Sequence, residues 1–96
     1  MMFSISIRKT GDVWLSGRFD ASRVEEAYHI LDALTESTTI DMTELDYISS
    51  AGLGALLKTQ KRLNDAGKML VLTHMNKLIR DIFRIARLDL VFTIKE

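Results

Sequence analysis

The chain has 96 residues, 47% of them hydrophobic and 27% charged, which excludes a disordered chain and fits one ordinary globular domain. Thirteen basic residues balance thirteen acidic residues and cysteine is absent, which excludes disulfides, thiolate metal sites and a general electrostatic attraction to nucleic acid. No stretch approaches the roughly 18 apolar residues of a membrane span, and the first residues lack a signal-peptide pattern. We therefore expect a cytoplasmic protein with no direct nucleic-acid contact and no membrane insertion.

The first twenty residues have the pattern of a β-hairpin. Apolar and polar residues alternate over residues 3–7 and again over 13–19, and Thr10-Gly11-Asp12 between them favours a turn. A helix is predicted next, because Ser22-Arg23-Val24-Glu25 has the spacing of a capping box, in which the Ser hydroxyl and the Glu carboxylate each bind an amide at the helix start. The apolar residues of this helix recur at helical spacing: Val24, Ala27, Tyr28, Leu31 and Leu34.

Strands and helices alternate over the rest of the chain. Residues 38–42 are predicted as a short β-branched strand, 69–73 as an apolar central strand and 91–94 as a closing strand. A second helix follows a loop and ends near Gly67, a natural left-handed cap, and Asn76 can cap a third helix. The apolar stripes of these helices are Leu53, Leu56, Leu57 and Leu63, and then Leu78, Ile79, Ile82, Phe83 and Ala86.

This order predicts an α/β fold in which residues 1–96 form a single domain. Strands that alternate with single helices imply parallel neighbours joined by right-handed crossovers. The element order β-β-α-β-α-β-α-β therefore predicts a mixed, mostly parallel sheet. Because the outer strands alternate polar and apolar residues, we expect the helices mainly on one face, with the other face partly wet.

Functional groups in such a sheet gather beyond the carboxyl ends of the strands. The segments expected at this rim are residues 17–22, 46–54 and 74–76. The middle segment is the richest, because Ser49 or Ser50 can cap the second helix, and the first amides of a helix attract an anion. Gly52 and Gly54 each cost roughly 1 kcal/mol of helix stability relative to Ala and expose the backbone. This pattern leaves two interpretations open, a simple N-cap with close helix–sheet packing or a functional surface.

The rim lacks the patterns of an enzyme. Ser50, Asp41 and His74 could be imagined as nucleophile, orienting acid and base, but the Gly-x-Ser-x-Gly elbow is missing. Gly52-Leu53-Gly54 lacks the third glycine of a dinucleotide-binding loop. His29 and His74 stand in different elements without carboxylates at ligand spacing. We therefore expect no catalytic residue, no metal ligand and no cofactor.

Two further features have more than one interpretation. Trp14 lies on the polar phase of its strand, where it can pack under a chain end or form an exposed contact surface. The second and third helices have basic faces, which are solvated or contact an acidic protein surface. The basic residues are Lys58, Lys61 and Arg62 on the second helix, and Arg80, Arg84 and Arg87 on the third.

The segment from Asp41 to Gly54 resembles the signature of STAS domains, the family of bacterial anti-sigma factor antagonists. In that signature a strand ends in Asp, a few residues lead to an apolar pair, and Asp-Ser-Ser/Thr-Gly-Leu-Gly follows at a helix start. Leu15-Ser16-Gly17-Arg18-Phe19-Asp20 is similar to the family's Leu-x-Gly-x-Leu/Phe-Asp segment. The predicted element order fits a stand-alone STAS domain over the whole chain.

The resemblance implies a binding module and not an enzyme. Stand-alone members bind an anti-sigma factor with a histidine-kinase-like fold, which frees the sigma factor; that serine kinase phosphorylates the antagonist at the second helix start, and a phosphoserine phosphatase restores it. Counting back from Gly52-Leu53-Gly54 places the phosphorylated serine at Ser50, with Ser49 as a rival acceptor. The residues expected to contact the partner are Asp20, Ser49, Ser50, Gly52, Leu53, Lys58 and Arg62.

The sequence departs from the signature at three positions. Ser49 stands where the family has Asp, Ala51 where it has Ser or Thr, and Arg87 where it has Gly, so the third helix is expected to end without a glycine cap. The first change removes a carboxylate beside the acceptor. The altered residues that flank Ser50 motivate an alternative, in which the chain is a STAS subunit of a membrane transport or lipid-trafficking complex and its rim holds a partner constitutively.

Overall fold

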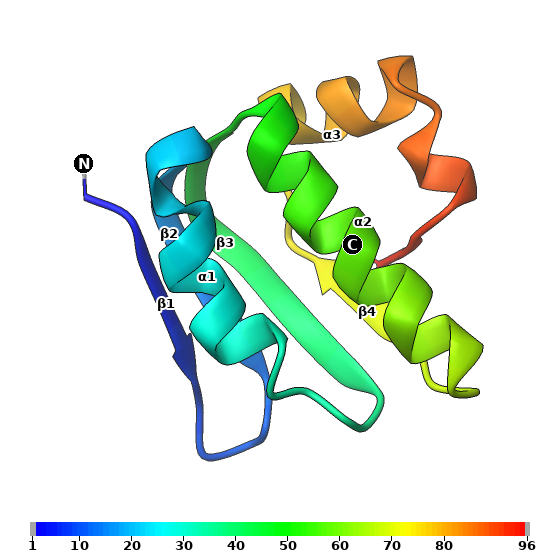
Figure 1. Ribbon diagram of the computed structural model, residues 1–96. Coiled ribbons are helices and arrows are strands. Elements are labelled where there is room, and N and C mark those ends of the chain that lie inside the picture. Colours follow the sequence, from blue (N-terminus) through cyan, green and yellow to red (C-terminus); the bar gives the residue numbers. More distant parts are fainter. Residues whose placement is uncertain (1, 96) are drawn as a thin grey trace.

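The sheet of this protein consists of one antiparallel hairpin and three parallel strand pairings (Figure 1). The structure is a computed structural model and describes residues 2–95. Met1 and Glu96, which the domain prediction included, lie outside the described residues. The strands are β1 (Ser4–Ile7), β2 (Val13–Phe19), β3 (Thr38–Ile48), β4 (Leu70–Thr73) and β5 (Thr93–Lys95). They lie in the order β1-β2-β3-β4-β5, with β1 antiparallel to β2 and the other neighbours parallel. The predicted mixed, mostly parallel sheet is confirmed.

Three helices connect the parallel strands: α1 (Val24–Leu31), α2 (Ser50–Asp65) and α3 (Lys77–Ile85). Short 3-10 turns, η1 (Ala21–Arg23) and η2 (Leu88–Leu90), precede α1 and follow α3. Each crossover moves one strand along the sheet in the same direction, so right-handed crossovers place their helices on the same side. α1 and α2 lie across one face of the sheet, and α3 lies at the carboxyl ends of its strands (Figure 1). The predicted element order and helix placement are confirmed.

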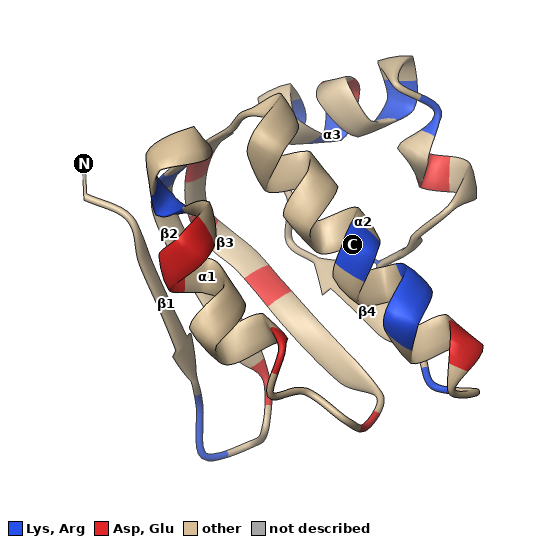
Figure 2. Cartoon of the chain, in the orientation of Figure 1, with Lys and Arg blue, Asp and Glu red and all other residues tan. Residues whose placement is uncertain are grey.

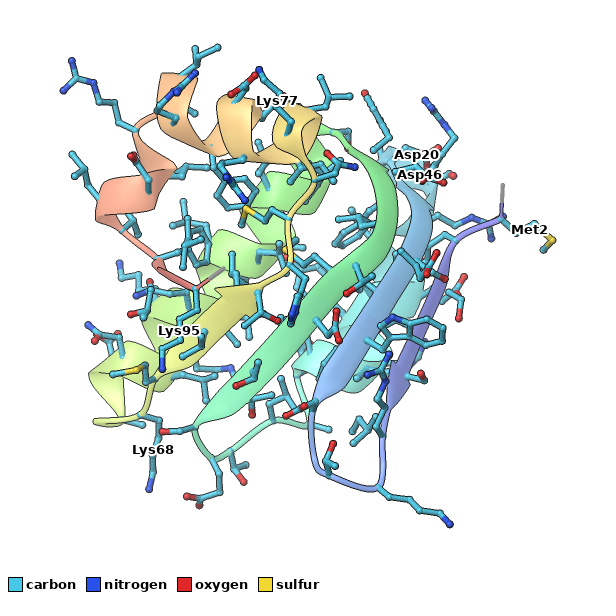
Figure 3. All side chains as sticks on the ribbon, turned by 180° about the vertical axis from the view of Figure 1, so that it is seen from behind. Met2, Asp20, Asp46, Lys68, Lys77 and Lys95 are labelled. Atoms are coloured by element: carbon cyan, nitrogen blue, oxygen red, sulfur yellow. The ribbon has the colours of Figure 1, made fainter. Side chains whose placement is uncertain are left out.

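The core lies between the sheet and α1 and α2. Alternate residues of β2 and β4 point into it, as their period-two patterns predict. The fully buried side chains include Val13, Leu15, Phe19, Leu31, Ile40, Leu56, Leu63 and Leu72. On the opposite face, seen from behind in Figure 3, Trp14 is half-buried under the Arg8 guanidinium, which lies 4.6 Å from the ring centroid. Arg18 lies over Tyr47 in the same way, at 4.2 Å, so arginine stems partly cover this wetter face.

Strand β3 is longer than predicted, because residues 46–48 continue the strand instead of forming a loop. The pairing with β2 shifts twice, so that β3 has an extra residue at each of two β-bulges. The carboxylate of Asp41 supports the first bulge by accepting from the amide and the hydroxyl of Thr43, at 2.9 and 2.6 Å. Each bulge shifts the alternation of buried and exposed residues by one position. The later residues of β3 therefore do not follow the period-two pattern from which strands were predicted. The buried residues are Ile40, Met42, Leu45 and Ile48.

The predicted capping box at Ser22 is wrong. Asp20 is the cap: its carboxylate accepts from the Ser22 amide at 3.0 Å and from the Ser22 hydroxyl at 2.6 Å. Ser22 therefore lies inside η1, and α1 begins two residues later, at Val24, with no side-chain cap of its own. Aspartate caps a helix start as well as serine does. Asp20, two residues before Ser22, therefore determines where η1 begins.

The inward stripe of α2 also differs from the prediction, because Leu57 is 38% exposed. The buried stripe consists of Gly52, Ala55, Leu56, Thr59 and Leu63. Small residues and a threonine occupy it because α2 packs closely on the sheet, and the Thr59 hydroxyl satisfies itself by donating to the Ala55 carbonyl at 3.0 Å. Large apolar side chains were therefore an incomplete guide to the buried face.

The ends of β1, β4 and β5 differ by one or two residues from the prediction, and β1 begins at Ser4 instead of Phe3. Met69 precedes β4, and Val91 lies between η2 and β5; both are exposed. β5 accordingly covers residues 93–95, because η2 uses the preceding residues to turn the chain. Strand ends are where patterns of a few apolar residues carry least information.

The ends of α2 and α3 use the same left-handed conformation with different residues. After α2, Gly67 has φ +76°, and its amide and that of Lys68 donate to Asn64 and Leu63 at 3.0 and 2.8 Å, as in a Schellman motif. After α3, Arg87 has φ +62°, so α3 ends without a glycine, as expected. A non-glycine residue in this region costs about 1 kcal/mol.

Candidate functional site

The carboxyl ends of β2 and β3 and the start of α2 are joined by backbone hydrogen bonds. The Ser49 amide donates to the Phe19 carbonyl at 3.0 Å, which ties the end of β3 to the end of β2. The Asn76 side-chain amide donates to the Leu45 carbonyl at 3.0 Å, which ties the start of α3 to β3. The rim segments predicted from the sequence therefore meet, and Figure 3 shows Asp20, Asp46 and Lys77 at this end of the molecule.

Ser49 is the N-cap of α2. Its hydroxyl accepts from the Gly52 amide at 3.2 Å and donates to the Phe19 carbonyl at 3.3 Å. The side chain is half-buried, and both hydrogen bonds hold the helix start against the sheet. Serine thus performs the capping that an aspartate could perform at this position, which explains how the fold tolerates this departure from the signature.

Ser50 is the first residue of α2 and is exposed. Across residues 2–95 its hydroxyl has no hydrogen-bond partner, unlike that of Ser49. The first turn of α2 contains no acidic residue, and the amides there carry partial positive charge. An anion attached to Ser50 would therefore meet a favourable field from its own helix.

Gly52 and Gly54 differ in what surrounds them. A Cβ on Gly52 would lie 2.8 Å from the Phe19 carbonyl oxygen and 2.9 Å from a side-chain carbon of Ile48, so only glycine fits. A Cβ on Gly54 would meet nothing within 4 Å, and that residue is exposed. The close-packing interpretation therefore explains Gly52, whereas nothing in the fold requires a glycine at Gly54.

The other predicted contact residues lie along α2. Leu53 is half-buried and packs against the core. Lys58 lies over the Tyr28 ring of α1, with Nζ 5.2 Å from the centroid. Arg62 donates to the Leu31 and Leu34 carbonyls, each at 2.8 Å, and so caps the end of α1. With a rise of about 1.5 Å per residue, Lys58 and Arg62 lie about 12 and 18 Å along the axis from Ser50. The structure thus brings Asp20, Ser49, Ser50, Gly52 and Leu53 together but not Arg62.

Asp20 contributes a negative charge to the rim. The hydrogen bond from the Ser22 hydroxyl, with help from the Ser22 amide and nearby Arg18 and Arg23, holds the pKa of its carboxyl below the usual value. Asp46 lies near Asp20 in Figure 3 and is exposed. Asp46 and the exposed Leu57 were not among the predicted contact residues, and the exposed position of Asp46 follows from a bulge of β3 that the sequence pattern did not reveal.

Residues 50–57, the first half of α2, carry no charged side chain. Figure 2 shows this uncharged start, with basic residues on the later turns of α2 and on α3. The surface around Ser50 is therefore formed by small and apolar groups, with carboxylates at the β2 and β3 ends. Such a surface suits contact with another protein more than it suits catalysis.

The imagined trio of Ser50, Asp41 and His74 is not assembled. His74 Nδ1 lies 3.8 Å from Asp41, whose other oxygen pairs with Arg8 at 3.2 Å on the face away from α2. Burial raises the pKa of Asp41, but the Thr43 hydrogen bonds and the Arg8 charge outweigh it, so the pKa is lowered. No hydrogen bond joins Ser50 to either group among the described residues.

The surface formed by residues 2–95 has no pocket. In the same range, no three His, Cys, Asp or Glu side chains are grouped closely enough to hold a metal ion. None of the helices described is both long and apolar enough to cross a membrane. The candidate site at the start of α2 is an open surface of this described range.

Comparisons with known proteins agree with this fold. Residues 5–93 match the family model described as Mlab, STAS domain. A Thermotoga maritima protein assigned as an anti-sigma factor antagonist superposes with a TM-score of 0.79 at 16% identity, over 98% of this chain and 86% of that one. The unphosphorylated anti-sigma factor antagonist SpoIIAA gives 0.70 at 16% identity, over 99% and 88%.

The phosphorylated form of SpoIIAA, a Bacillus cell-fate determinant, gives a TM-score of 0.70 at 17% identity, over 99% of this chain and 92% of that one. At these identities the likeness establishes a shared fold. No curated protein matches the sequence.

Proposed function

The chain belongs to the STAS domain family, and we propose that it is an anti-sigma factor antagonist. It binds an anti-sigma factor of the histidine-kinase-like type and so frees a sigma factor. Phosphorylation of Ser50 by that kinase weakens the complex, and a phosphoserine phosphatase restores it. The observation that carries the proposal is the exposed, unpartnered Ser50 hydroxyl at the start of α2, beside a glycine that the fold does not require.

Ser50 is a better acceptor than Ser49. A kinase must reach the hydroxyl, and Ser50 is exposed whereas Ser49 is half-buried. Modification of Ser49 would also remove its hydrogen bonds to Gly52 and Phe19, at a cost of about 1 kcal/mol for the lost cap. Modification of Ser50 breaks no hydrogen bond among the described residues.

The switch acts on affinity and leaves the fold intact. A phosphate adds about −1.5 to −2 charges, which the amides at the start of α2 stabilise by about 0.3–1 kcal/mol. The same charge would have to lose its water when a partner packs against residues 50–57, which contain no basic side chain to pair with it. The complex is therefore weakened while the free domain is not.

The proposed contact surface is centred on Ser50. It includes Asp20 and Leu53, with Gly54 and the exposed Leu57 beside them, while Ser49 and Gly52 lie beneath it and hold the start of α2 against the sheet. Lys58 lies at its margin, and Arg62 supports it indirectly by capping α1. The names of the superposable structures, which are anti-sigma factor antagonists, support a binding role in preference to catalysis.

The test is the affinity of the purified protein for the anti-sigma kinase of the same genome, measured by calorimetry. Ser50→Ala should bind like wild type, whereas Ser50→Glu should bind at least about tenfold more weakly, because a charge is forced into the interface. Thr35→Glu, which adds the same charge in the exposed α1–β3 connection, is the matched control and should bind like wild type. A wild type that does not bind the kinase, or a Ser50→Glu variant that binds unchanged, would refute the proposal.

A second candidate function is a constitutive partner-binding subunit of a membrane transport or lipid-trafficking complex. The observation that favours it is the pair of residues around Ser50, because Ser49 and Ala51 replace the residues that flank the phosphorylated serine in the signature. Neighbouring genes separate the two candidates: an anti-sigma kinase gene supports the first, and transporter genes support the second. In the second case Ser50 would stay unmodified in cells, and a pull-down would return transporter subunits.

A further inference from the structure

Helix α3 buries only part of its apolar side. Ile79 and Phe83 are fully buried against the rest of the fold. Leu78 and Ile85 are 57% and 79% exposed, and Ile82 is half-buried. A helix that served only to cover the core would have polar residues at the exposed positions.

The exposed residues form a line along the helix. Leu78 and Ile85 are seven residues apart, which is almost two turns, and Ile82 lies between them on the same side. We call Leu78, Ile82 and Ile85 the α3 seam. Apolar residues at this spacing are what a second helix packs against. Leu90, the last residue of η2, and Val91, which follows it, are also exposed, so apolar surface is concentrated in this part of the described chain.

The polar side of α3 is basic. Residues 77–91 contain Lys77, Arg80, Arg84 and Arg87 against Asp81 and Asp89, so four positive and two negative charges give +2 in a chain whose net charge is zero. Figure 2 shows these basic residues along α3. Asp81 is already engaged by Lys77 at 2.9 Å and by Arg84 at 3.0 Å, so its charge is compensated within the helix.

This charge determines which occupant fits the seam. A second copy of the chain would bring one positive flank against another, which opposes association. A lipid surface is a poorer match, because membrane binding scales with the apolar area that is buried, and the seam offers only three apolar side chains, of which Ile82 is already half-buried. A helix of another protein with acidic residues beside its apolar stripe matches both the seam and the charge.

The start of α3 lies at the same rim as Ser50. The hydrogen bond from Asn76 to Leu45 fixes it there, and Figure 3 places Lys77 at the same end as Asp20 and Asp46. We propose that the α3 seam is a second contact surface, which binds an amphipathic, acidic-flanked helix of the anti-sigma factor. This inference rests on the proposed function, because one partner is taken to cover both the start of α2 and the seam.

The test uses the full chain and the anti-sigma kinase of the same genome. Leu78→Gln/Ile85→Gln should bind the kinase at least about tenfold more weakly than wild type, since buried apolar anchors carry most interface energy. Glutamine is a good helix former, so thermal melting should show an intact fold. Met69→Gln, at a 52% exposed apolar residue beside Lys68 at the opposite end in Figure 3, is the matched control and should bind like wild type.

A charge variant tests the acidic complement. Lys77→Gln/Arg84→Gln should weaken binding about threefold or more at low salt, and this difference should shrink as salt is added.

Normal binding by the seam variant Leu78→Gln/Ile85→Gln would overturn the inference and leave the proposed function standing, whereas a wild type that does not bind at all would overturn both. A wild-type dimer that the seam variant loses in sedimentation, or flotation of wild type but not the variant with phosphatidylglycerol vesicles, would also overturn the inference.

Discussion

The inward and outward sides of the first turns of α2 contain the same residue types in different situations. On the inward side, Ser49 caps the helix and Gly52 lies where a Cβ would meet the Phe19 carbonyl oxygen at 2.8 Å. On the outward side, Ser50 has no partner among the described residues, and Gly54 has open space around it. The fold therefore explains Ser49 and Gly52, whereas nothing in the fold requires Ser50 or Gly54.

Of the outward pair, Gly54 lowers helix stability, and the fold does not require this loss. A glycine inside a helix is about 0.5–1 kcal/mol less favourable than alanine, and a Cβ on Gly54 would meet nothing within 4 Å, so no close approach requires a glycine there. Positions at which a sequence breaks a local rule without a compensating contact are expected at functional sites. The outward side is therefore the side that the proposed function gives to a partner, and variants of the four residues can test this division.

Gly52→Ala should have the largest effect. The new methyl group would overlap backbone atoms of Phe19, which cannot rotate away, so the free energy of unfolding should fall by about 2 kcal/mol. Urea denaturation measures this loss. A change below about 0.5 kcal/mol would mean that the inward side is not constrained as described.

Ser49→Ala should lower the free energy of unfolding by about 1 kcal/mol, because the amide of Gly52 loses its acceptor. Ser50→Ala, one residue away, should change it by less than about 0.5 kcal/mol. The two variants form a matched pair in the same denaturation experiment. If Ser50→Ala were the more damaging of the two, the division between the inward and outward serines would be reversed.

Gly54→Ala should raise the free energy of unfolding by about 0.5–1 kcal/mol, because alanine favours the helix and its methyl group meets no atom within 4 Å. The same variant should bind the anti-sigma kinase more weakly than wild type, since the methyl group stands where the partner approaches. A substitution that raises the free energy of unfolding and lowers the affinity indicates a glycine that serves binding and not the fold. A variant that is stabilised and binds normally would show that Gly54 has no role in contact.

Ser50→Glu should have the smallest effect on stability, a gain of about 0.3 kcal/mol from the negative charge at the start of α2. Added salt should reduce that gain, because the charge is exposed. Thermal melting at low and at high salt measures both. A clear loss of stability would contradict the claim that the switch leaves the fold intact.

The sequence predicted the architecture well because its signals are local. The turn at Thr10-Gly11-Asp12, the left-handed Gly67 and the cap at Asn76 each depend on a few neighbouring residues, and the structure has all of them. The alternation of polar and apolar residues in the outer strands then predicted that the helices lie mainly on one face of the sheet. The STAS resemblance rested on residues 15–20 and 41–54, two segments whose later residues the structure joins at the rim through the hydrogen bond from Ser49 to Phe19.

The features that were missed depend on distant partners. The bulges of β3 require its register with β2, which no period-two pattern contains. The outward position of Leu57 follows from close packing of α2 around Gly52, and Arg62 is used by the end of α1. Which of Gly52 and Gly54 serves the fold could be decided only by the atoms around each.

The most direct test of the outward side as a phosphorylation switch is site mapping. Wild type, Ser49→Ala and Ser50→Ala would each be incubated with the anti-sigma kinase of the same genome and ATP, and the modified residues identified by mass spectrometry. The account predicts phosphate on Ser50 in wild type and in Ser49→Ala, and none in Ser50→Ala. Phosphate on Ser49, or an unmodified wild type, would contradict it.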